Sequence, residues 1–273
     1  MAESTKPYLR LVRPFTLIAP VAAGALGYYA LSRSFDIVAL FMGLVLALLQ
    51  GAGQVVNQIA DIEVDRINKP YRPLVRGEVS IGEAKIIAVC LYVVALVIAV
   101  LVSFRFFIIA SIVAFFSCFY NIGPIKAKRN FILSYSWLAI SRGLLPWIAA
   151  SMVAGNLNMA LKFGIVTALW VWATQCTKDV PDVEGDRLAG IITLPVAYGI
   201  DGVRVWIAAN GLIILPRAVL LLNLHPAFLY LGAMAVMCAL YVDRPWLGEN
   251  NFGWAMFYLG IVYIYLLACV INT

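Results

Sequence analysis

Long apolar segments constrain the fold of this chain more than any other feature. A helix needs roughly 20 apolar residues to cross the hydrocarbon core of a bilayer, and segments near that length recur throughout the 273 residues. We predict nine of them, over residues 15–31, 37–56, 84–102, 106–122, 131–154, 162–177, 203–222, 226–241 and 253–271. The composition agrees, because 63% of the residues are hydrophobic and only 12% are charged, about half the charged fraction of ordinary soluble domains. The sequence therefore predicts an all-α, multi-pass membrane bundle of about nine helices.

The positions of the Lys and Arg residues predict how these spans are oriented. Loops on one side of the predicted membrane hold fifteen of the twenty Lys and Arg residues, whereas the opposite loops hold Arg33, Arg105, Lys162 and Arg217. Cytoplasmic loops are enriched in positive charge. We therefore expect an integral protein of the cell membrane with its N-terminus and its active-site loops in the cytoplasm. The net charge of +6 suits an anionic membrane surface or substrate and requires no nucleic acid.

No long linker or low-complexity tract divides the chain, so we expect one membrane domain over residues 1–273. Two acidic stretches follow the second and the sixth predicted spans and thus emerge on the same side of the membrane. This arrangement is typical of two related halves, roughly 1–125 and 126–273, that contribute to one site. The five cysteines include no CxxC pair, and we interpret them as apolar filler. Nothing in the sequence indicates an oligomeric state.

The two acidic stretches are NQIADIEVDRINKPYRPLVRGEVS, residues 57–80, and KDVPDVEGDR, residues 178–187. Each carries three oxygen-bearing side chains that would share one helical face, within an arc of about 80° in the first stretch and about 60° in the second. These six residues are Asn57, Asp61, Asp65, Asp179, Asp182 and Asp186. Ordinary charges of interfacial loops rarely align twice in this way, so we interpret the six residues as a functional group.

Six such side chains facing one another would form an oxygen-rich cage, and clustered carboxylates repel each other unless cations compensate them. Mg²⁺ suits such a site because it binds one or two carboxylates together with phosphate oxygens. Basic residues also surround the two stretches: Arg66, Lys69, Arg72, Arg76, Lys126, Lys128, Arg129, Lys178 and Arg187. Metal ions combined with Lys and Arg side chains at a membrane face indicate binding of a diphosphate.

Local signals in the first stretch predict a loop and the start of a helix. Pro70, Pro73 and Gly77 favour a turn-rich loop. Ser80 stands three residues before Glu83, which is the spacing of a capping box. We therefore expect the third span to begin at this point.

The two stretches resemble the two aspartate-rich signatures of the UbiA superfamily of intramembrane prenyltransferases, in matching order and on the same membrane side. The Arg13-Pro14 pair, FYNIGPIKAKR at 119–129 and SRG at 141–143 also resemble features of this family. The resemblance implies a bundle around a central, largely apolar cavity, in which the head of a prenyl diphosphate lies between the two motifs. It further implies two Mg²⁺ ions as cofactors and transfer of the prenyl group to a lipophilic acceptor, with release of diphosphate.

Carried over by position, the resemblance implies roles for individual residues. The six oxygen-bearing residues would hold the metal ions, and any acid–base step would use the candidate catalytic residues Asp61, Asp65, Asp182 and Asp186. The candidate substrate contacts are Asn57, Arg66, Arg72, Tyr120, Lys128 and Lys178, to which Arg142 is added because of its depth in the fifth span. The donor would be geranylgeranyl diphosphate or a similar prenyl diphosphate. The acceptor would be either an aromatic quinone or chlorin-type precursor or geranylgeranylglyceryl phosphate.

Arg142 lies near the middle of the fifth predicted span, about 18 Å from either end. Its side chain cannot reach the membrane surface from that depth, so it must face the bundle interior or a wet cavity. Three interpretations are open. Arg142 pairs with an acid or with carbonyl groups freed near Gly143 and Pro146, or it binds an anionic group of the acceptor, or it contacts the donor.

A cation-coupled membrane transporter is the alternative function, because transporters also use acids within membrane spans. Such a protein needs acids in mid-span, whereas these acids lie at the ends of spans, among basic residues that would repel a transported cation. A CDP-alcohol phosphotransferase would need a continuous DxxDGxxAR-like run, which this sequence lacks. Prenyl transfer is therefore the preferred prediction.

Overall fold

The computed structural model of the protein describes residues 2–123, 125–246 and 251–271. Within these ranges the chain is almost wholly helical, and β-pairing is limited to two isolated bridges, Asn130 with Ile192 and Pro245 with Asn251. The predicted all-α fold is therefore confirmed. Residue 124, within the FYNIGPIKAKR stretch, lies outside the described residues.

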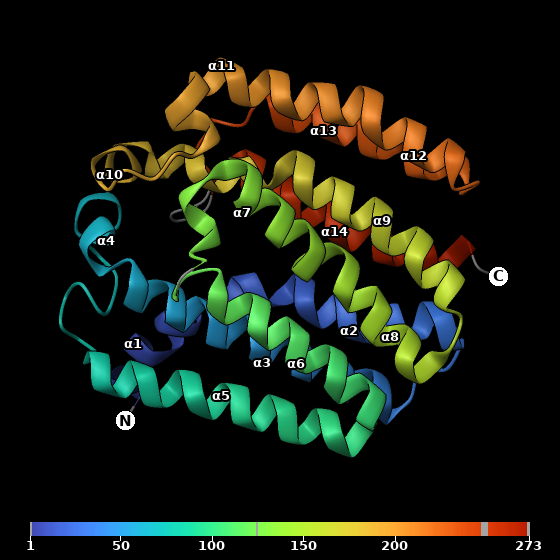
Figure 1. Ribbon diagram of the computed structural model, residues 1–273, viewed down its shortest axis with the longest axis horizontal. Coiled ribbons are helices and arrows are strands. Elements are labelled where there is room, and N and C mark those ends of the chain that lie inside the picture. Colours follow the sequence, from blue (N-terminus) through green and yellow to red (C-terminus); the bar gives the residue numbers. More distant parts are fainter. Residues whose placement is uncertain (1, 124, 247–250, 272–273) are drawn as a thin grey trace.

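The N-terminal half consists of helices that run lengthwise beside one another (Figure 1). Its elements are α1 (Ala2–Val12), η1 (Pro14–Leu17), α2 (Ile18–Ser32), α3 (Ile37–Ala60), α4 (Ile62–Asn68), α5 (Ile81–Val102) and α6 (Phe104–Phe119). Helix α3 packs against α2 on one side and against α5 and α6 on the other. This packing makes α3, which carries the start of the first acidic stretch, a central element of the bundle.

The C-terminal half contains more interrupted helices. Its elements are η2 (Ala127–Arg129), α7 (Phe131–Leu138), η3 (Ala139–Leu144), α8 (Leu145–Ala154), α9 (Leu157–Thr174), η4 (Gln175–Asp182), α10 (Val183–Leu188), α11 (Leu194–Ala209), η5 (Asn210–Ile214), α12 (Leu215–Leu221), η6 (Pro226–Leu229), α13 (Tyr230–Leu240) and α14 (Phe252–Ile271). Helices α8 and α14 both contact α2 and so join the two halves. Helix α9 packs between η3, α8 and α14, while α11 packs against α13.

Seven helical segments of the described chain are long and apolar enough to cross a membrane. They are Pro14–Ser32, Ile37–Ala60, Ile81–Val102, Phe131–Ala154, Leu157–Leu188, Leu194–Leu221 and Phe252–Ile271. Two shorter apolar helices, Phe104–Phe119 and Pro226–Leu240, coincide with the two remaining predicted spans. Only 17% of the most apolar part of α5 is buried, and the outward apolar side chains of such a helix suit lipid rather than water. The protein is an integral membrane protein with a helical-bundle fold.

Large aromatic side chains hold α8, α9 and α14 together in the middle of the bundle. The indole of Trp147 stacks on the ring of Tyr265, with 4.3 Å between ring centroids, and packs against Phe163 at 5.0 Å. All three side chains are fully or almost fully buried. Stacked aromatic rings add to the hydrophobic contribution of their burial, so these three helices form a rigid wall.

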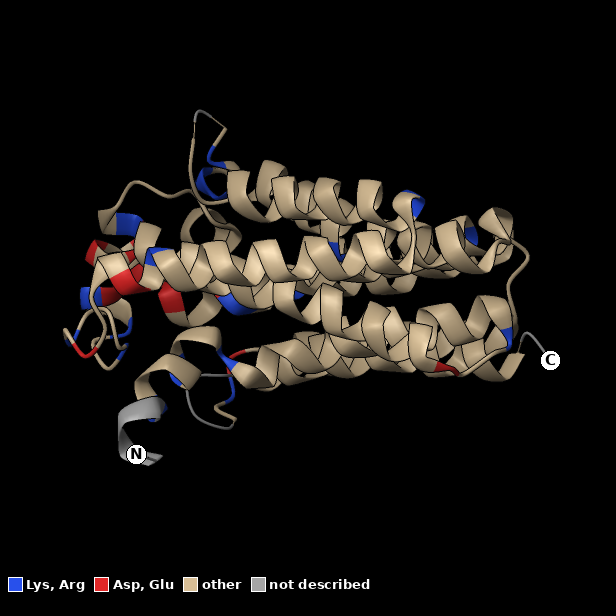
Figure 2. Cartoon of the chain, turned by 90° about the horizontal axis from the view of Figure 1, so that it is seen from below, with Lys and Arg blue, Asp and Glu red and all other residues tan. Residues whose placement is uncertain are grey.

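Most of the acidic residues gather at one end of the bundle, the end where α4 and α10 lie (Figures 1 and 2). The two short helices are in contact, although their motifs are far apart in the sequence. Between α4 and α5 the chain forms the predicted turn-rich loop, in which Gly77 adopts a left-handed conformation with φ of 69°. The predicted capping box is also confirmed, because the backbone N–H of Glu83 donates to Ser80 and that of Ser80 donates to Glu83.

The second acidic stretch departs from the α-helical geometry assumed for it. The segment from Gln175 to Asp182 is a 3₁₀ helix that contains Pro181. Proline lacks a backbone N–H and disfavours continuation of an α-helix. Side chains three residues apart eclipse each other in a 3₁₀ helix, so Asp179 and Asp182 share one face for a different reason from the one predicted.

The first acidic stretch contains a helix break at Asp61, where φ is −107° and ψ is 11°. The backbone N–H of Asp61 still donates to the carbonyl of Asn57, and that of Asp65 donates to the carbonyl of Asp61. The i, i+4 hydrogen-bond pattern therefore continues across the break. The three predicted side chains keep their helical spacing although they belong to two helices.

Candidate active site

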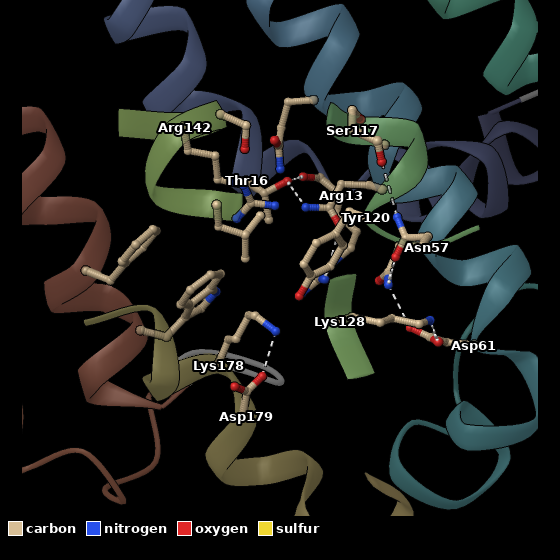
Figure 3. A pocket seen from close by; sticks show the side chains of 18 of the residues that line it. Arg13, Thr16, Asn57, Asp61, Ser117, Tyr120, Lys128, Arg142, Lys178 and Asp179 are labelled. Atoms are coloured by element: carbon tan, nitrogen blue, oxygen red, sulfur yellow. Dashed lines mark hydrogen bonds and ion pairs between the residues drawn. The ribbon is translucent and has the colours of Figure 1, made fainter. Parts of the chain in front are cut away.

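A cavity of about 200 Å³ lies between the two acidic stretches and extends into the bundle. Eleven of the residues predicted from the sequence line it: Asn57, Asp61, Asp65, Arg72, Tyr120, Lys128, Arg142, Lys178, Asp179, Asp182 and Asp186. Several of their side chains point toward a common space from different helices (Figure 3). Deeper in the bundle the lining becomes apolar and includes Leu49, Phe116 and Ile261. The cavity thus joins a polar mouth to a hydrophobic interior.

Arg66 is the exception among the predicted contacts. It does not belong to the cavity lining and instead pairs with Glu63 at 3.1 Å, with both side chains mostly exposed. Adjacent residues on a helix point about 100° apart, so Arg66 faces outward when its neighbour Asp65 faces the cavity. The position of Arg66 offers no support for the expected contact with a diphosphate.

Four of the five motif carboxylates form ion pairs with basic residues. Asp61 pairs with Lys128, Asp65 with Arg72, Asp179 with Lys178, and Asp182 with Lys69. Lys128 comes from η2 and Lys69 from the middle of the first stretch, directly after α4, so two of these pairs link distant segments of the chain. All eight side chains are less than 30% exposed. Neutralisation of this kind allows many carboxylates to share one partly buried space.

Asp186 differs from the other four carboxylates. Its residue is only 8% exposed and lines the cavity, yet its carboxylate forms no hydrogen bond or ion pair with any described residue. A buried ionised carboxylate without a partner is costly. Asp186 is therefore the motif carboxylate best placed to accept an additional cation.

Asn57 is held by two hydrogen bonds that both use its amide nitrogen. The Nδ2 group donates to Asp61 Oδ2 at 2.6 Å and to Asn121 Oδ1 at 2.9 Å. The amide oxygen of Asn57 consequently stays available to accept from a donor or to bind a metal ion. Asn121 orients this group and also lines the cavity.

Asn68 connects the two acidic stretches through its side-chain amide. Its Nδ2 donates to the carbonyl oxygen of Asp182 at 2.9 Å, and its Oδ1 accepts from the backbone N–H of Gly185 at 2.9 Å. Gly185 is required here, because an added Cβ would lie 2.5 Å from the Asn68 amide nitrogen. We define Asn68, Asp182 and Gly185 as the motif clasp. The clasp fixes the separation between the two motifs.

Tyrosine side chains shape the cavity wall behind the second motif. The hydroxyl of Tyr120 shares a hydrogen bond with Ser134 Oγ at 2.9 Å, and Lys178 Nζ lies 5.8 Å from the centroid of the Tyr120 ring. This is a cation–π distance, so the ring face of Tyr120 is positioned to stabilise positive charge. The hydroxyl of Tyr135 donates to Asp179 from the buried side of the cavity.

Burial changes the protonation of Asp65, which lies in α4 outside the membrane spans. Loss of hydration raises the pKa of its carboxyl to about 6, although the positive charges of Arg72 and Lys69 act in the opposite direction. Asp61 adds to the increase, because a neighbouring negative charge disfavours ionisation. Asp65 therefore titrates close to neutral pH.

The residues present suit Mg²⁺, but not as the closed cage that the sequence predicted. Among the described residues no three Asp, Glu, His or Cys side chains are close enough to hold one metal ion by themselves. Four of the five motif carboxylates are instead each engaged by a Lys or Arg side chain. Mg²⁺ typically binds one or two carboxylates and completes its shell with phosphate oxygens and water. The unpartnered Asp186 and the oxygen of Asn57 fit that requirement.

Several residues of the cavity lining were not predicted from the sequence, among them Arg13, Gln54, Asn68, Asn121, Thr193 and Tyr258. Arg13 belongs to the Arg13-Pro14 pair and Asn121 to FYNIGPIKAKR, both of which resemble features of the family. These motifs could therefore have identified the two residues as part of the site. Thr193 follows the second motif, and its buried hydroxyl has no hydrogen-bond partner among the described residues. Gln54 precedes Asn57 by one helical turn, which is a position that faces the same side of α3. Tyr258 has no comparable signal in the sequence.

Comparisons with known proteins identify the family to which the chain is similar. Residues 17–267 match the UbiA prenyltransferase family. The chain is 30% identical over 202 residues to the digeranylgeranylglyceryl phosphate synthase of Methanocaldococcus jannaschii, covering 72% of this chain and 69% of the relative. It is 28% identical over 256 residues to the bacteriochlorophyll synthase 34 kDa chain of Chloroflexus aurantiacus, covering 89% of this chain and 82% of the relative.

A solved structure with the same fold is that of a UbiA homolog from Archaeoglobus fulgidus bound to GPP and Mg²⁺. The two folds superpose with a TM-score of 0.70 at 18% sequence identity, covering 97% of this chain and all of the homolog. The shared fold and the family match over residues 17–267 together include both acidic stretches. The protein belongs to the UbiA prenyltransferase family.

Proposed function

We propose that this prenyltransferase moves a prenyl group from a prenyl diphosphate to a lipophilic acceptor and depends on Mg²⁺ for the reaction. One observation carries the proposal: both acidic motifs and their basic partners line the polar mouth of a cavity whose interior is apolar. The charged mouth suits a diphosphate head, and the interior suits a hydrocarbon tail. The UbiA homolog from Archaeoglobus fulgidus, bound to GPP and Mg²⁺, supports this assignment of donor and cofactor.

The metal-binding residues would be the six oxygen-bearing residues of the motifs: Asn57, Asp61, Asp65, Asp179, Asp182 and Asp186. We propose two ions, one for each motif, because the two groups enter the cavity from separate helices. Bound Mg²⁺ would supply positive charge that stabilises the diphosphate leaving group. The motif clasp would keep the two groups at a fixed separation.

The diphosphate contacts would be Arg72, Lys128 and Lys178, to which we add Lys69. Each of these cations pairs with a motif carboxylate. A carboxylate that binds a metal ion shares its charge with that ion, so its Lys or Arg partner becomes available to a phosphate oxygen. Such charge-assisted contacts stabilise the charge that develops as the bond between the prenyl C1 and the diphosphate oxygen breaks. Both electrons of that bond leave with the diphosphate.

The remaining positive charge on the allylic carbon would be protected by the cavity wall. The apolar lining excludes water, which would otherwise capture the cation. The ring face of Tyr120 lies at the junction between the charged mouth and the interior, and a cation over such a face is stabilised. The acceptor then forms the new bond to C1 and loses a proton. Asp61, Asp65, Asp182 and Asp186 are the candidate acceptors of that proton.

The two relatives indicate two acceptor classes. The name of the Methanocaldococcus jannaschii relative points to geranylgeranylglyceryl phosphate, and that of the Chloroflexus aurantiacus relative points to a chlorin-type precursor. An aromatic quinone precursor is a third acceptor class on chemical grounds.

We further propose that the single domain is oriented with its N-terminus and the motif loops in the cytoplasm, since fifteen of the twenty Lys and Arg residues are assigned to that side.

The decisive experiment incubates the purified protein with geranylgeranyl diphosphate, Mg²⁺ and each acceptor in turn. Diphosphate release and the mass of the prenylated product are measured together. A product that forms with at least one acceptor supports the proposal, and absence of both product and diphosphate release would contradict it. Uptake of labelled cations into proteoliposomes tests the transporter alternative. Four of the five motif carboxylates are paired with Lys or Arg, which does not favour transport of a cation.

A further inference from the structure

Arg142 occupies an unusual backbone segment in the middle of the bundle. The residues Ala139–Leu144 form a π-helix between α7 and α8. Such wide turns are rare and are frequently found at functional sites. Gly143 in this segment lies against the backbone of Ala168, and an added Cβ would come within 2.4 Å of it. The close approach of η3 to α9 thus holds the π-helix in place and directs the adjacent Arg142 into the cavity.

The guanidinium of Arg142 has no hydrogen-bond or ion-pair partner among the described residues. The polar groups that act on it electrostatically are Tyr258, Tyr120 and Arg13, and no carboxylate is among them. Arg142 is enclosed by the bundle, and its accessible surface faces the cavity. Of the three interpretations drawn from the sequence, pairing with an acid or a backbone carbonyl therefore finds no support.

Arg13 brings a second positive charge to the same region. Its backbone is left-handed, with φ of 57°, at the start of η1, and its Nη1 donates to Gln54 Oε1 at 3.4 Å. Gln54 in turn donates to Thr16 Oγ1 at 3.4 Å. Figure 3 shows the side chains of Arg13 and Arg142 extending toward each other, apart from Asp61 and Asp179. We call Arg13 and Arg142 the arginine pair.

The two guanidinium groups repel each other, and that of Arg142 has lost much of its hydration within the bundle. Arginine within a span is costly unless a partner of opposite charge compensates it. The planar guanidinium is also the side chain best suited to bind phosphate or carboxylate through two parallel hydrogen bonds. The arginine pair is therefore a built site for an oxyanion.

We infer that the arginine pair binds an anionic group of the acceptor, a phosphate or a carboxylate, at a subsite separate from the diphosphate site. This inference rests on the proposed prenyl transfer. Gln54, which contacts Arg13, precedes Asn57 by three residues and so lies about 4.5 Å deeper along α3. The subsite is thus one helical turn further into the bundle than the metal-binding motif. An acceptor anchored there places its nucleophilic atom toward the prenyl C1 if its anionic group is only a few bonds from that atom.

The inference predicts a preference for charge in the acceptor, which binding measurements can test without turnover. Trp254 lines the cavity, so quenching of tryptophan fluorescence provides a titration signal. Geranylgeranylglyceryl phosphate is compared with its dephosphorylated alcohol, and homogentisate with methylhydroquinone, which lacks the carboxylate. We expect the wild-type protein to bind the anionic member of at least one pair about tenfold or more tightly. Equal affinity within both pairs would overturn the inference.

Variants then assign the preference to the arginine pair. In Arg142→Gln the preference for the anionic member should fall about tenfold, while the affinity for the neutral member stays the same. Arg142→Lys should retain part of the preference, because it keeps the charge and loses the planar fork. Arg105→Gln is the matched control, since Arg105 is exposed at the start of α6, and it should leave the preference unchanged. If Arg142→Gln does not fold, the same titrations of Arg142→Lys against wild type decide the point.

A different result would assign Arg142 to the donor. If Arg142→Gln weakens binding of geranylgeranyl diphosphate and leaves the acceptor preference intact, the inference is wrong. Failure of the proposed function gives a separate signature, namely no Mg²⁺-dependent release of diphosphate by the wild-type protein with any acceptor. A charge preference in the titrations would persist in that case, so the two failures are distinguishable.

Discussion

The hydroxyl of Tyr135 donates a 2.8 Å hydrogen bond to Asp179 Oδ2. The other carboxylate oxygen of Asp179 accepts from Lys178 Nζ at 2.6 Å. Tyr135 is fully buried behind the cavity, and Asp179 is only 3% exposed. The tyrosine therefore fixes the orientation of a proposed metal ligand from the side that no substrate reaches.

Replacement of Tyr135 by Phe should weaken this orientation and lower stability. The substitution leaves one buried oxygen of Asp179 without its donor, which costs about 1–3 kcal/mol. We expect a lower midpoint of thermal unfolding and a weaker apparent affinity for Mg²⁺ in the transfer reaction. Tyr265→Phe is the matched control, because Tyr265 is equally buried but its hydroxyl has no partner among the described residues. A Tyr135→Phe protein that behaves like this control would show that the hydrogen bond has no role.

Removal of the metal should abolish prenyl transfer. We expect no product in the presence of EDTA and full recovery when Mg²⁺ is added in excess. Asp61→Ala and Asp182→Ala should each reduce the rate by about a hundredfold or more, while the proteins elute as folded monodisperse species in detergent. Glu63→Ala is the control, because Glu63 pairs with Arg66 on the exposed side of α4 and should retain near-normal activity. Normal rates in Asp61→Ala or Asp182→Ala would refute the proposed metal site.

The sequence predicts the existence and order of the spans well because those signals are local, although the helices predicted over 162–177 and 203–222 extend over Leu157–Leu188 and Leu194–Leu221. A run of apolar residues, the Ser80 and Glu83 capping box and the turn residues between Pro70 and Gly77 each act over a few positions. The first span, predicted over 15–31, is observed over Pro14–Ser32, and the last, predicted over 253–271, over Phe252–Ile271. Such features can be predicted without knowing which residues distant in the sequence are in contact.

The details of the site depend on distant contacts and were less predictable. Arg66 was assigned to the substrate contacts by its position in the resemblance, but the direction of a side chain depends on how its helix packs. The expected carboxylate cage is replaced by ion pairs such as Asp61 with Lys128, which lie far apart in the sequence. The π-helix at Arg142 depends on the contact of Gly143 with Ala168. No local pattern of residues specifies these pairings.

The affinity for Mg²⁺ should depend on pH through Asp65. Its pKa is raised to about 6, mainly by burial, so a proton competes with the metal ion below that pH. We expect the apparent Mg²⁺ affinity to be constant above pH 7 and to fall by up to about tenfold for each pH unit below 6. A titration of activity against Mg²⁺ at several pH values measures this dependence. Asp65→Asn should remove the part of the pH dependence that comes from the Asp65 carboxyl group. An affinity unchanged between pH 5 and pH 7 would contradict the assignment.

The same shift has an opposite consequence for folding in the absence of Mg²⁺. A carboxyl group whose pKa is higher in the folded protein than in the unfolded chain favours folding when it is protonated. Its contribution to the free energy of unfolding is complete below about pH 4 and is lost as the pH rises through about 6. Thermal unfolding of the wild-type protein and of Asp65→Asn, measured in EDTA across this range, should differ most above pH 6.

The motif clasp should determine how tightly the donor binds. Asn68→Ala removes both hydrogen bonds that join the first motif to Asp182 and Gly185, so the two motifs lose their fixed separation. We expect the affinity for geranylgeranyl diphosphate with Mg²⁺ to fall about tenfold, with a loss of stability of about 1–3 kcal/mol. Asn210→Ala is the control, because Asn210 donates only to Trp206 within its own helical segment. It should leave donor affinity unchanged.

Gly185→Ala provides an independent test of the same contact. The added Cβ would lie 2.5–2.7 Å from the side-chain atoms of Asn68, so the variant should also bind the donor weakly. In the double variant the Asn68 side chain is absent and the clash disappears. Residues in direct contact have non-additive effects, so the double variant should bind the donor no more weakly than Asn68→Ala alone. Losses that simply add would show that the two residues act independently and that the clasp does not couple the motifs.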